Sequence, residues 1–441
     1  MNILIIEQVR LVDTHYQLFE KMLLTSFSIL PTLYARHLAA ITPKNHMVKI
    51  LNERYEPIRI SEEYDLVIIH FSSAASSRAY EIADKFRQKK VIVVLSGLHA
   101  SALPKEALEH ADSVLLGRGE GNYLQLLNDV EKDTLKSLYD PCKYQSYDIP
   151  LTRVELPGFM MTGAVEATRG CPYHCSFCPD ANTPNGRVFY PRPVEEVIEE
   201  IKMIPQKTIM FYDASLTIDP TYTKELFSQM KSLHKRFFCS GNVNVLAQDE
   251  ELVALSREAG CISWLIGFES ISQKTLDDVG KVTNTVETYK TVVDSIHAHH
   301  MAVIGDFMFG FDTDTPEVFD ETLKLINNLG IDVADFSILT PFPGTPLFES
   351  FKKQGRILTS DWRNYTMHSV VFKPQQMSTT QLMQGNQYLY ASFYNPIETL
   401  KRITKSLKLG LYPFFMVISR NLISMIASQK ISIISKENEG D

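Results

Sequence analysis

Long apolar runs are missing from this sequence. No stretch of eighteen or more uninterrupted apolar residues occurs in its 441 residues, which argues against a membrane-spanning helix. Positive charge is also scarce, because 44 Lys and Arg stand against 52 Asp and Glu. The net charge of −8 argues against a general nucleic-acid binder. Low-complexity segments and short repeats are absent too, so the length predicts two or three ordinary globular domains.

Cysteine is sparse, with six residues in the whole chain. No secretory leader precedes them, so we expect a reducing compartment and a cytoplasmic protein. Cys142, Cys239 and Cys261 are scattered, and we expect them to be small buried apolar residues.

The other three cysteines, Cys171, Cys175 and Cys178, form a C-x₃-C-x₂-C run. Three thiolates on one loop can bind three irons of a four-iron cluster, which leaves the fourth iron open for another ligand. A structural zinc site is an alternative, although His174 would be an awkward fourth ligand directly beside Cys175. A disulfide with one free thiol is a second alternative. The spacing favours the cluster.

Apolar strand patterns alternate with helical patterns over residues 1–135. The expected strands are Met1–Glu7, Met47–Asn52, Asp65–His70, Val91–Leu95 and Ser113–Leu116, and the expected helices are Leu33–Ile41, Ser77–Gln88 and Lys105–His110. This alternation predicts a doubly wound, Rossmann-like α/β domain, which we expect to be joined to the next domain by a linker over residues 136–160.

Small residues follow three of these strands, where such folds bind ligands. The small residues are Ser72 and Ser73 after the third strand, Gly97 after the fourth, and Gly117 and Gly119 after the fifth. His99 and Glu120 lie beside them. Small side chains allow a bulky flat ligand to approach the backbone. Ordinary turn chemistry, which also favours Gly and Ser, remains an alternative.

Residues 161–350 repeat the alternation and predict a partial parallel (β/α)₆ barrel. A first strand, Gly163–Ala167, leads into the cysteine loop, and we expect further strands at Thr208–Tyr212, Phe237–Asn242, Ser263–Phe268, Val303–Phe309 and Ala334–Leu339. Barrel chemistry lies at the carboxyl ends of the strands. Asp213, Ser240, Asn242 and Glu269 fall there. Alternatively, each of these residues caps a helix or is an ordinary polar residue of a loop.

The cysteine run with Phe177 before its last cysteine resembles the signature of the radical S-adenosylmethionine (SAM) superfamily. Residues 95–120 resemble the cobalamin-binding domain that precedes the radical SAM domain in one subfamily. The matching segments are Ser96–His99, Pro104–Ala107, Ala111–Val114 and Gly117–Glu120. Ile266–Ser270 and Thr340–Pro346 also resemble segments of that subfamily, and the resemblance extends to about Met377.

This resemblance implies a cobalamin-dependent radical SAM enzyme. The cysteines would hold a [4Fe–4S] cluster, and the four polar residues at the barrel strand ends would contact SAM. The seven residues at the first-domain strand ends would contact cobalamin. A C-methyltransferase that uses a 5′-deoxyadenosyl radical and methylcobalamin is the main reading, and a cyclase or oxidoreductase without methyl transfer is the alternative. Either needs an external electron donor such as ferredoxin or flavodoxin.

Some positions depart from the subfamily pattern. Ser96 replaces a glycine, and Arg118 replaces a glutamate and could meet an acidic side chain of the corrin. Asp13-Thr14-His15 begins like a cobalt-binding motif, but Leu18 occupies its glycine position.

Residues 351–441 predict a mainly helical extension. Ser378 or Thr379 could begin a helix that runs through Phe393. Residues 400–428 combine apolar and basic side chains, and Pro413 is expected to kink or split a helix there. Two readings stay open for this tail: a helix packed on the barrel, or an interfacial helix at the inner membrane face, which would suit a lipid or isoprenoid substrate.

Overall fold

The apolar runs near the amino terminus form one parallel sheet in the order β2–β1–β3–β4–β5–β6. The computed structural model describes residues 1–7, 32–53, 56–140 and 161–438. The strands are β1 (Asn2–Glu7), β2 (Met47–Asn52), β3 (Leu66–His70), β4 (Ile92–Ser96), β5 (Ser113–Leu115) and β6 (Leu138–Tyr139). The strand order reverses between β1 and β3, so a ligand is expected beyond the carboxyl ends of these strands.

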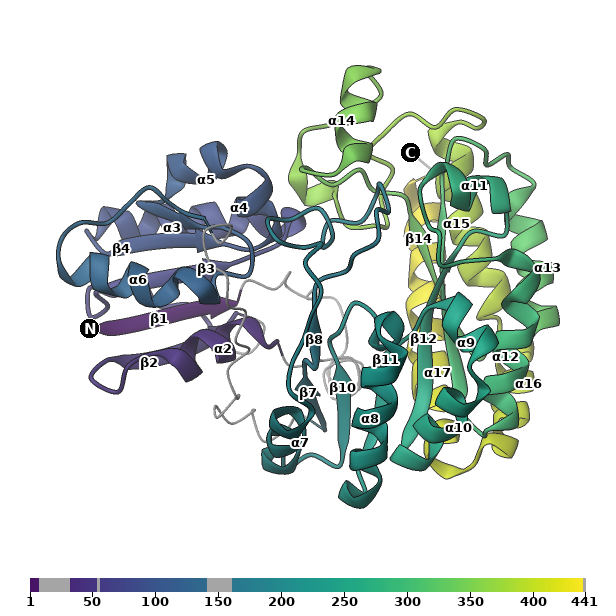
Figure 1. Cartoon of the computed structure of the whole chain (residues 1–441). Helices are drawn as coiled ribbons and strands as arrows, with labels where there is room; N and C mark the ends of the chain where they lie inside the picture. Colours follow the sequence, from purple (N-terminus) through teal and green to yellow (C-terminus); the bar gives the residue numbers. More distant parts are fainter. Residues whose placement is uncertain (8–31, 54–55, 141–160, 439–441) are drawn as a thin grey trace.

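Helices cover both faces of the first sheet, as the alternation predicts (Figure 1). The helices are α2 (Tyr34–Ile41), α3 (Ser76–Gln88), α4 (Leu98–Ala102), α5 (Pro104–His110) and α6 (Glu120–Glu131). Apolar residues of α3, α4 and α5 form a core on one face, and those of α2 and α6 form a second core on the other. Sequence reasoning missed α4, α6 and β6. Because β6 pairs with β5, the sheet runs past residue 135, where we expected the first domain to end.

The second sheet also has six parallel strands, in the order β14–β13–β12–β11–β10–β7. They are β7 (Thr162–Val165), β10 (Thr208–Phe211), β11 (Arg236–Ser240), β12 (Cys261–Glu269), β13 (Ala302–Phe309) and β14 (Val333–Ile338). Within the described ranges the edge strands β7 and β14 do not pair with each other, so the sheet stays open as a partial barrel. All six expected strands are confirmed.

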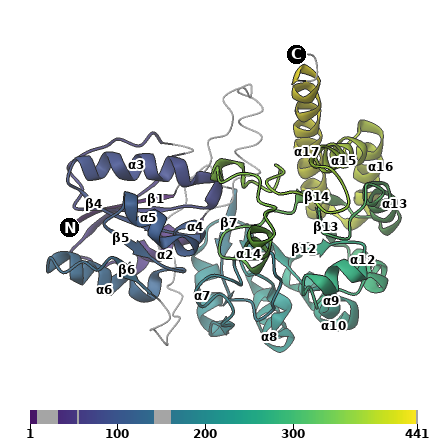
Figure 2. The same ribbon diagram turned by 90° about the horizontal axis from the view of Figure 1, so that it is seen from above.

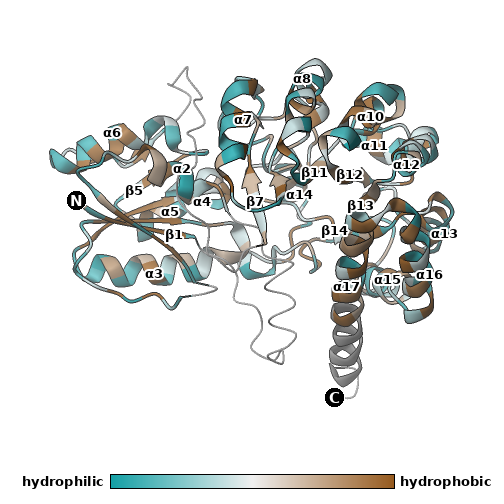
Figure 3. Cartoon of the chain, turned by 90° about the horizontal axis from the view of Figure 1, so that it is seen from below, coloured by the Kyte–Doolittle hydropathy of each residue, from teal (hydrophilic) through white to brown (hydrophobic). Residues whose placement is uncertain are grey.

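The helices of this unit lie on the outer side of its curved sheet (Figure 3). They are α7 (Val194–Met203), α8 (Pro220–Met230), α9 (Val243–Gln248), α10 (Glu250–Ala259), α11 (Gln273–Asp278), α12 (Tyr289–Ala298) and α13 (Val318–Leu329). A short antiparallel pair, β8 (Thr168–Arg169) and β9 (Tyr190–Pro191), closes the base of the cysteine loop. This pair and the short helices α9 and α11 were not predicted.

The carboxyl-terminal helices are α14 (Pro346–Lys353), α15 (Thr379–Phe393), α16 (Pro396–Ser406) and α17 (Leu411–Asn438), which projects beyond the barrel (Figure 2). Ser378 is the N-cap of α15, as predicted, and it forms a capping box with Gln381. Pro413 does not split the tail. It lies in the first turn of α17, where no intrahelical acceptor awaits its missing N–H. In the described part of the chain, every helix is too short or too polar to cross a bilayer.

Candidate metal centre at the cysteine loop

The cysteine loop leaves the carboxyl end of β7 and returns at β9. Gly170, just before Cys171, has φ +76°, and a Cβ there would overlap the carbonyl group of Val188. The amide of Cys171 donates to the Gly186 carbonyl at 2.8 Å, which fixes the loop entrance. Only glycine fits this left-handed position, so Gly170 sets the direction in which Cys171 points.

Two remote segments hold the centre of the loop. The Ser176 amide donates to the Val279 carbonyl at 2.9 Å, and the Ser176 carbonyl accepts from the Leu347 amide at 3.1 Å. Leu347 directly follows the Pro-rich turn Thr340–Pro346, so this turn supports the cysteine loop. The Asn182 side-chain amide donates to the Cys178 carbonyl at 2.8 Å. Hydrogen bonds to the backbone of the loop thus fix it on both sides.

The three thiols are half-buried and free. Burial raises the pKa of Cys171 and Cys175, partly offset by the positive charge of Lys281, and it raises the pKa of Cys178 to about 11. Thiols with raised pKa values must lose protons to become ligands, so binding iron here would release protons. A disulfide is absent among the five described cysteines, and Cys142 lies outside the described residues.

The described side chains do not converge in a way that fits a single metal ion. Among them, no three His, Cys, Asp or Glu groups come close enough to share one ion, which weakens the zinc reading with His174. In an iron–sulfur cubane each cysteine binds a different iron, so its ligands lie farther apart than those of one zinc. Three free, half-buried thiols on one fixed loop therefore fit a cluster better than zinc.

Asp213 follows β10 and holds the start of the cysteine loop. Its carboxylate accepts hydrogen bonds from the Ala167 amide and from the amide and hydroxyl of Thr168. Burial and, to a smaller extent, the negative charge of Glu166 raise the pKa of Asp213 to about 7. The hydrogen bonds from Ala167 and Thr168 lower the pKa but only partly offset the burial. The predicted SAM contact of Asp213 stays a prediction, because here the carboxylate supports the loop backbone.

This buried carboxyl predicts a pH-dependent stability. Its folded pKa lies above the ordinary value of 3.8, so the folded state binds the extra proton and stability falls as pH rises from about 4 to about 7. The full shift corresponds to roughly 4 kcal/mol. We expect Asp213→Asn to flatten the pH dependence of urea unfolding between pH 5 and pH 8. Asp278→Asn, at an exposed carboxylate paired with Lys274, is the control and should leave it unchanged.

Ser240, Asn242 and Glu269 lie at neighbouring strand ends, as predicted. Ser240 ends β11, and Asn242 precedes α9, where its side-chain amide contacts the Tyr173 hydroxyl of the cysteine loop. Glu269 ends β12 and pairs with Lys281 at 2.9 Å. Their SAM contacts stay predictions.

His99 is fully buried in the first domain. Its Nδ1 lies 3.0 Å from the Ser73 hydroxyl, and its Nε2 lies 3.1 Å from the Glu106 carboxylate. The indole N–H of Trp362 donates to the same carboxylate at 3.1 Å, which joins the carboxyl-terminal extension to the first domain. Ser73 and His99 therefore act as scaffold here, whereas Ser72 is exposed. Their cobalamin contacts remain predictions.

The remaining first-domain residues lie at the same sheet edge. Gly97, Gly117 and Gly119 all have positive φ, so their backbone conformation alone accounts for glycine. Glu120 is buried. Burial alone would raise its pKa, but the charge of Arg169 and a hydrogen bond from His37 lower it to about 2. Its carboxylate is thus engaged with protein groups.

An ion network joins this edge to the cysteine loop. Arg169, two residues before Cys171, bonds Glu120 at 2.7 Å and Glu166 at 2.8 Å. Arg118 also pairs with Glu166, and its contact with the corrin stays a prediction. The carboxyl end of the first sheet is therefore tied directly to the loop that carries the cysteines.

Sequence reasoning missed three polar residues at the carboxyl edge of the first sheet. Tyr34 stacks on His70 with ring centroids 3.8 Å apart, and burial lowers the pKa of His70 to about 4. The Tyr34 hydroxyl is hydrogen-bonded to Ser96, whereas His37 Nε2 is buried without a hydrogen-bond partner among the described residues. The unpartnered nitrogen of His37 at the switch point fits a polar ligand there. No motif marks these residues in the sequence, and His15 lies outside the described residues.

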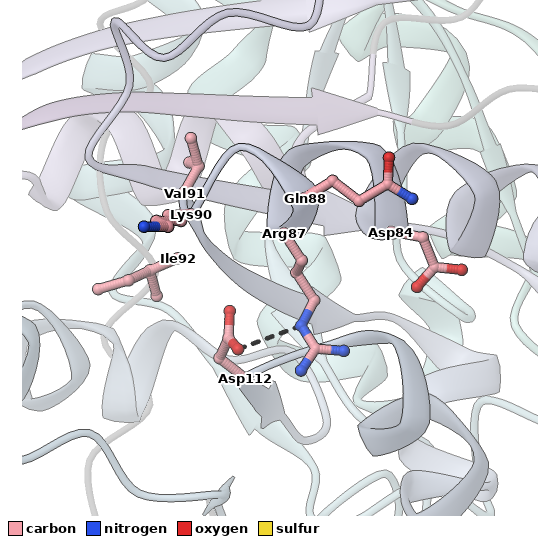
Figure 4. Close-up of a pocket in the computed structure, with 7 residues that line it drawn as sticks. All are labelled: Asp84, Arg87, Gln88, Lys90, Val91, Ile92 and Asp112. Atoms are coloured by element: carbon pink, nitrogen blue, oxygen red, sulfur yellow. Dashed lines mark hydrogen bonds and ion pairs between the residues drawn. The ribbon is translucent and has the colours of Figure 1, made fainter.

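A separate pocket of about 570 Å³ opens on the first domain, far from these groups. Figure 4 shows Arg87 and Asp112 paired across it, with Asp84, Gln88, Lys90, Val91 and Ile92 around them. It lies where α3 ends and β4 begins, at the amino end of a strand. Ligands of such sheets bind at the other end, so this pocket is not the functional site.

Known proteins resemble this chain in sequence and in fold. The sequence profile of the radical SAM superfamily matches residues 165–326. Bacteriochlorophyllide d C-12(1)-methyltransferase of Chlorobaculum tepidum is 30% identical over 358 residues, which cover 77% of each chain. Bacteriochlorophyllide d C-8(2)-methyltransferase of the same organism is 29% identical over 83% of this chain and 88% of its own.

The fold likeness extends over nearly the whole chain. The radical SAM methyltransferase TsrM from Kitasatospora setae, solved with cobalamin and a [4Fe–4S] cluster bound, superposes with a TM-score of 0.69 at 14% identity. The superposition covers 98% of this chain and 99% of TsrM. This likeness shows a shared fold.

Proposed function

This chain belongs to the radical SAM superfamily, and we propose that it is a cobalamin-dependent C-methyltransferase acting on an unactivated carbon. One observation carries the proposal. The three-cysteine loop at the carboxyl end of the second sheet is tied by Arg169 to the carboxyl edge of the first sheet. A ligand at each edge would therefore face the other, as radical and methyl donor must.

The residues present fit the groups that the family implies. When bound, a [4Fe–4S] cluster, SAM and cobalamin supply hydrogen abstraction and a methyl group for the substrate carbon. Cys171, Cys175 and Cys178 would hold three irons. Asn242 and Glu269 would orient SAM, while His37 offers a buried, unpartnered nitrogen for the corrinoid. Asp213 keeps the loop in place, and a small electron carrier such as ferredoxin or flavodoxin would supply electrons.

The relatives suggest where to look for the substrate. Two of them are named as methyltransferases of bacteriochlorophyllides, so tetrapyrroles are the first substrate class to test. Lipids and isoprenoids are the second class, given the apolar tail described below.

Isotope tracing tests the proposal. Protein purified without oxygen is reconstituted with iron, sulfide and cobalamin, and is then incubated with methyl-labelled SAM, a reductant and fractionated cell extract. We expect label in one extractable product, together with 5′-deoxyadenosine. A product that has lost hydrogen or gained oxygen, without label, supports the cyclase or oxidoreductase alternative. If neither product forms, both readings are overturned.

We also propose a cytoplasmic location with peripheral contact to an anionic membrane through residues 400–428. Leu400, Leu407, Leu411 and Phe415 are 58–64% exposed in this stretch. Lys401, Lys405 and Lys408 are exposed between them, although the whole chain carries a net charge of −8. Exposed apolar side chains beside a local positive charge suit the interface of an anionic bilayer. Val417 and Asn421, on another side of α17, are buried, which supports partial packing on the barrel.

Vesicle binding tests the contact. We expect co-sedimentation with phosphatidylglycerol vesicles and weak binding to phosphatidylcholine vesicles. Leu411→Glu with Phe415→Glu should abolish binding, whereas Met47→Glu, at an exposed apolar side chain of β2, should not. Equal binding by all variants would contradict the proposal. A dimer that the double variant disrupts would also contradict it, because the exposed apolar side chains would then belong to a dimer interface.

A further inference from the structure

A buried ion pair lies between the end of β12 and the cysteine loop. Glu269 Oε1 and Lys281 Nζ are 2.9 Å apart, and their side chains are only 11% and 17% exposed. Glu269 has φ +61°, which is unusual for a residue with a Cβ, and the pairing of β12 with β13 shifts register beside it. Such a conformation persists only where its surroundings hold it, so something must fix Glu269 here.

The segment that carries Lys281 is bound to the cysteine loop on one side. The Val279 carbonyl accepts from the Ser176 amide at 2.9 Å, and the Cys175 thiol lies 3.7 Å from the Gly280 carbonyl. Gly280 has φ +74°, and a Cβ there would lie 3.1 Å from the His174 carbonyl oxygen. Lys281 therefore follows a backbone that touches the cysteine loop at consecutive residues.

The same segment is bound to β12 on its other side. The Asn284 side-chain amide donates to the Gly267 carbonyl at 2.9 Å and to the Phe268 carbonyl at 3.0 Å. A Cβ on Gly267 would overlap Glu269 Oε1 and would lie 3.2 Å from Lys281 Nζ. The ion pair thus lies directly over Gly267, in space that any other residue would fill.

We infer that Lys281 is a positioning residue for the radical chemistry, which orients the Glu269 carboxylate for SAM and places a positive charge beside the three cysteines. The inference rests on the proposed function, in which these cysteines carry a cluster. A buried carboxylate without its partner cation is strongly disfavoured. Without Lys281, the Glu269 side chain is therefore expected to leave its present position. A nearby positive charge also favours the more negative, reduced form of a cluster.

Two measurements on oxygen-free, cluster-loaded protein test the inference. Lys281→Met should weaken SAM binding about tenfold or more by calorimetry, consistent with the loss of a buried charge-assisted contact. It should also shift the cluster midpoint to a more negative potential in a titration followed by electron paramagnetic resonance. Lys281→Arg keeps the charge and should restore the midpoint. Lys274→Met, at an exposed lysine of α11, is the control and should change neither quantity.

Gly267→Ala provides a second route that removes no charge. It should displace the ion pair and weaken SAM binding while leaving iron content unchanged. Unaltered SAM affinity and midpoint in Lys281→Met would overturn the inference, even if methyl transfer is confirmed. Conversely, wild-type protein that binds SAM but transfers no methyl group would overturn the proposed function alone.

Discussion

Replacing Cys171 with alanine is expected to abolish the iron–sulfur signal and all SAM cleavage. A cubane held by three cysteines has no spare protein ligand, and the described residues offer no other group of ligating side chains nearby to replace the missing thiolate. We expect the absorbance and paramagnetic signals of anaerobically reconstituted protein to disappear, and iron to fall from about four atoms per chain to background. Cys175→Ala and Cys178→Ala should behave in the same way.

Cys261→Ala is the matched control for this loss. Cys261 is fully buried at the start of β12, on the far end of that strand from Glu269. Its removal leaves a small cavity but touches no iron, so it should lower stability modestly and keep the cluster. A cluster that persists in Cys171→Ala would contradict the metal centre proposed above, and one lost equally in Cys261→Ala would show that general destabilisation causes the loss.

Local patterns made the cysteine loop and the strands predictable. The three cysteines lie within eight residues, so their spacing alone brings them to one loop. The strands appear as apolar runs, and the carboxyl ends of parallel strands gather at one edge, which places Glu269 near Asn242. A helix such as α9, with two buried residues, shows too little periodicity to be recognised.

The partners of the site residues could not be predicted, because they come from distant parts of the chain. Glu120 meets Arg169, which is 49 positions away, and the Cys175 thiol meets the Gly280 carbonyl, which is 105 positions away. His99 shows the same limit. Its sequence context resembled a cofactor contact, yet the fold places it against Ser73 and Glu106. Spacing predicts what lies on one loop, and tertiary packing decides what each polar atom meets.

Arg169→Met is expected to destabilise the folded chain by about 3–5 kcal/mol. The guanidinium is 7% exposed and lies between two carboxylates, Glu120 and Glu166, that are 6% and 1% exposed. Without it, Arg118 and His37 are left to compensate two buried negative charges. The depressed pKa of Glu120 contributes stability at pH values above about 4.5, and the substitution should remove that contribution. Urea unfolding at pH 3 and pH 8 measures both effects, with the larger loss at pH 8, because part of the Glu120 contribution is already absent at pH 3 in the unsubstituted protein.

Two further variants separate this charge effect from lost packing. Arg363→Met removes an exposed arginine that pairs with Asp361 at the surface, and it should leave the stability nearly unchanged. Adding Glu120→Gln to Arg169→Met removes one stranded charge, so the double variant should recover part of the lost stability. Failure of the double variant to recover any stability would show that packing of Arg169, and not its charge, joins the first sheet to the cysteine loop. Recovery would establish that the carboxylates at this edge depend on the arginine that precedes Cys171.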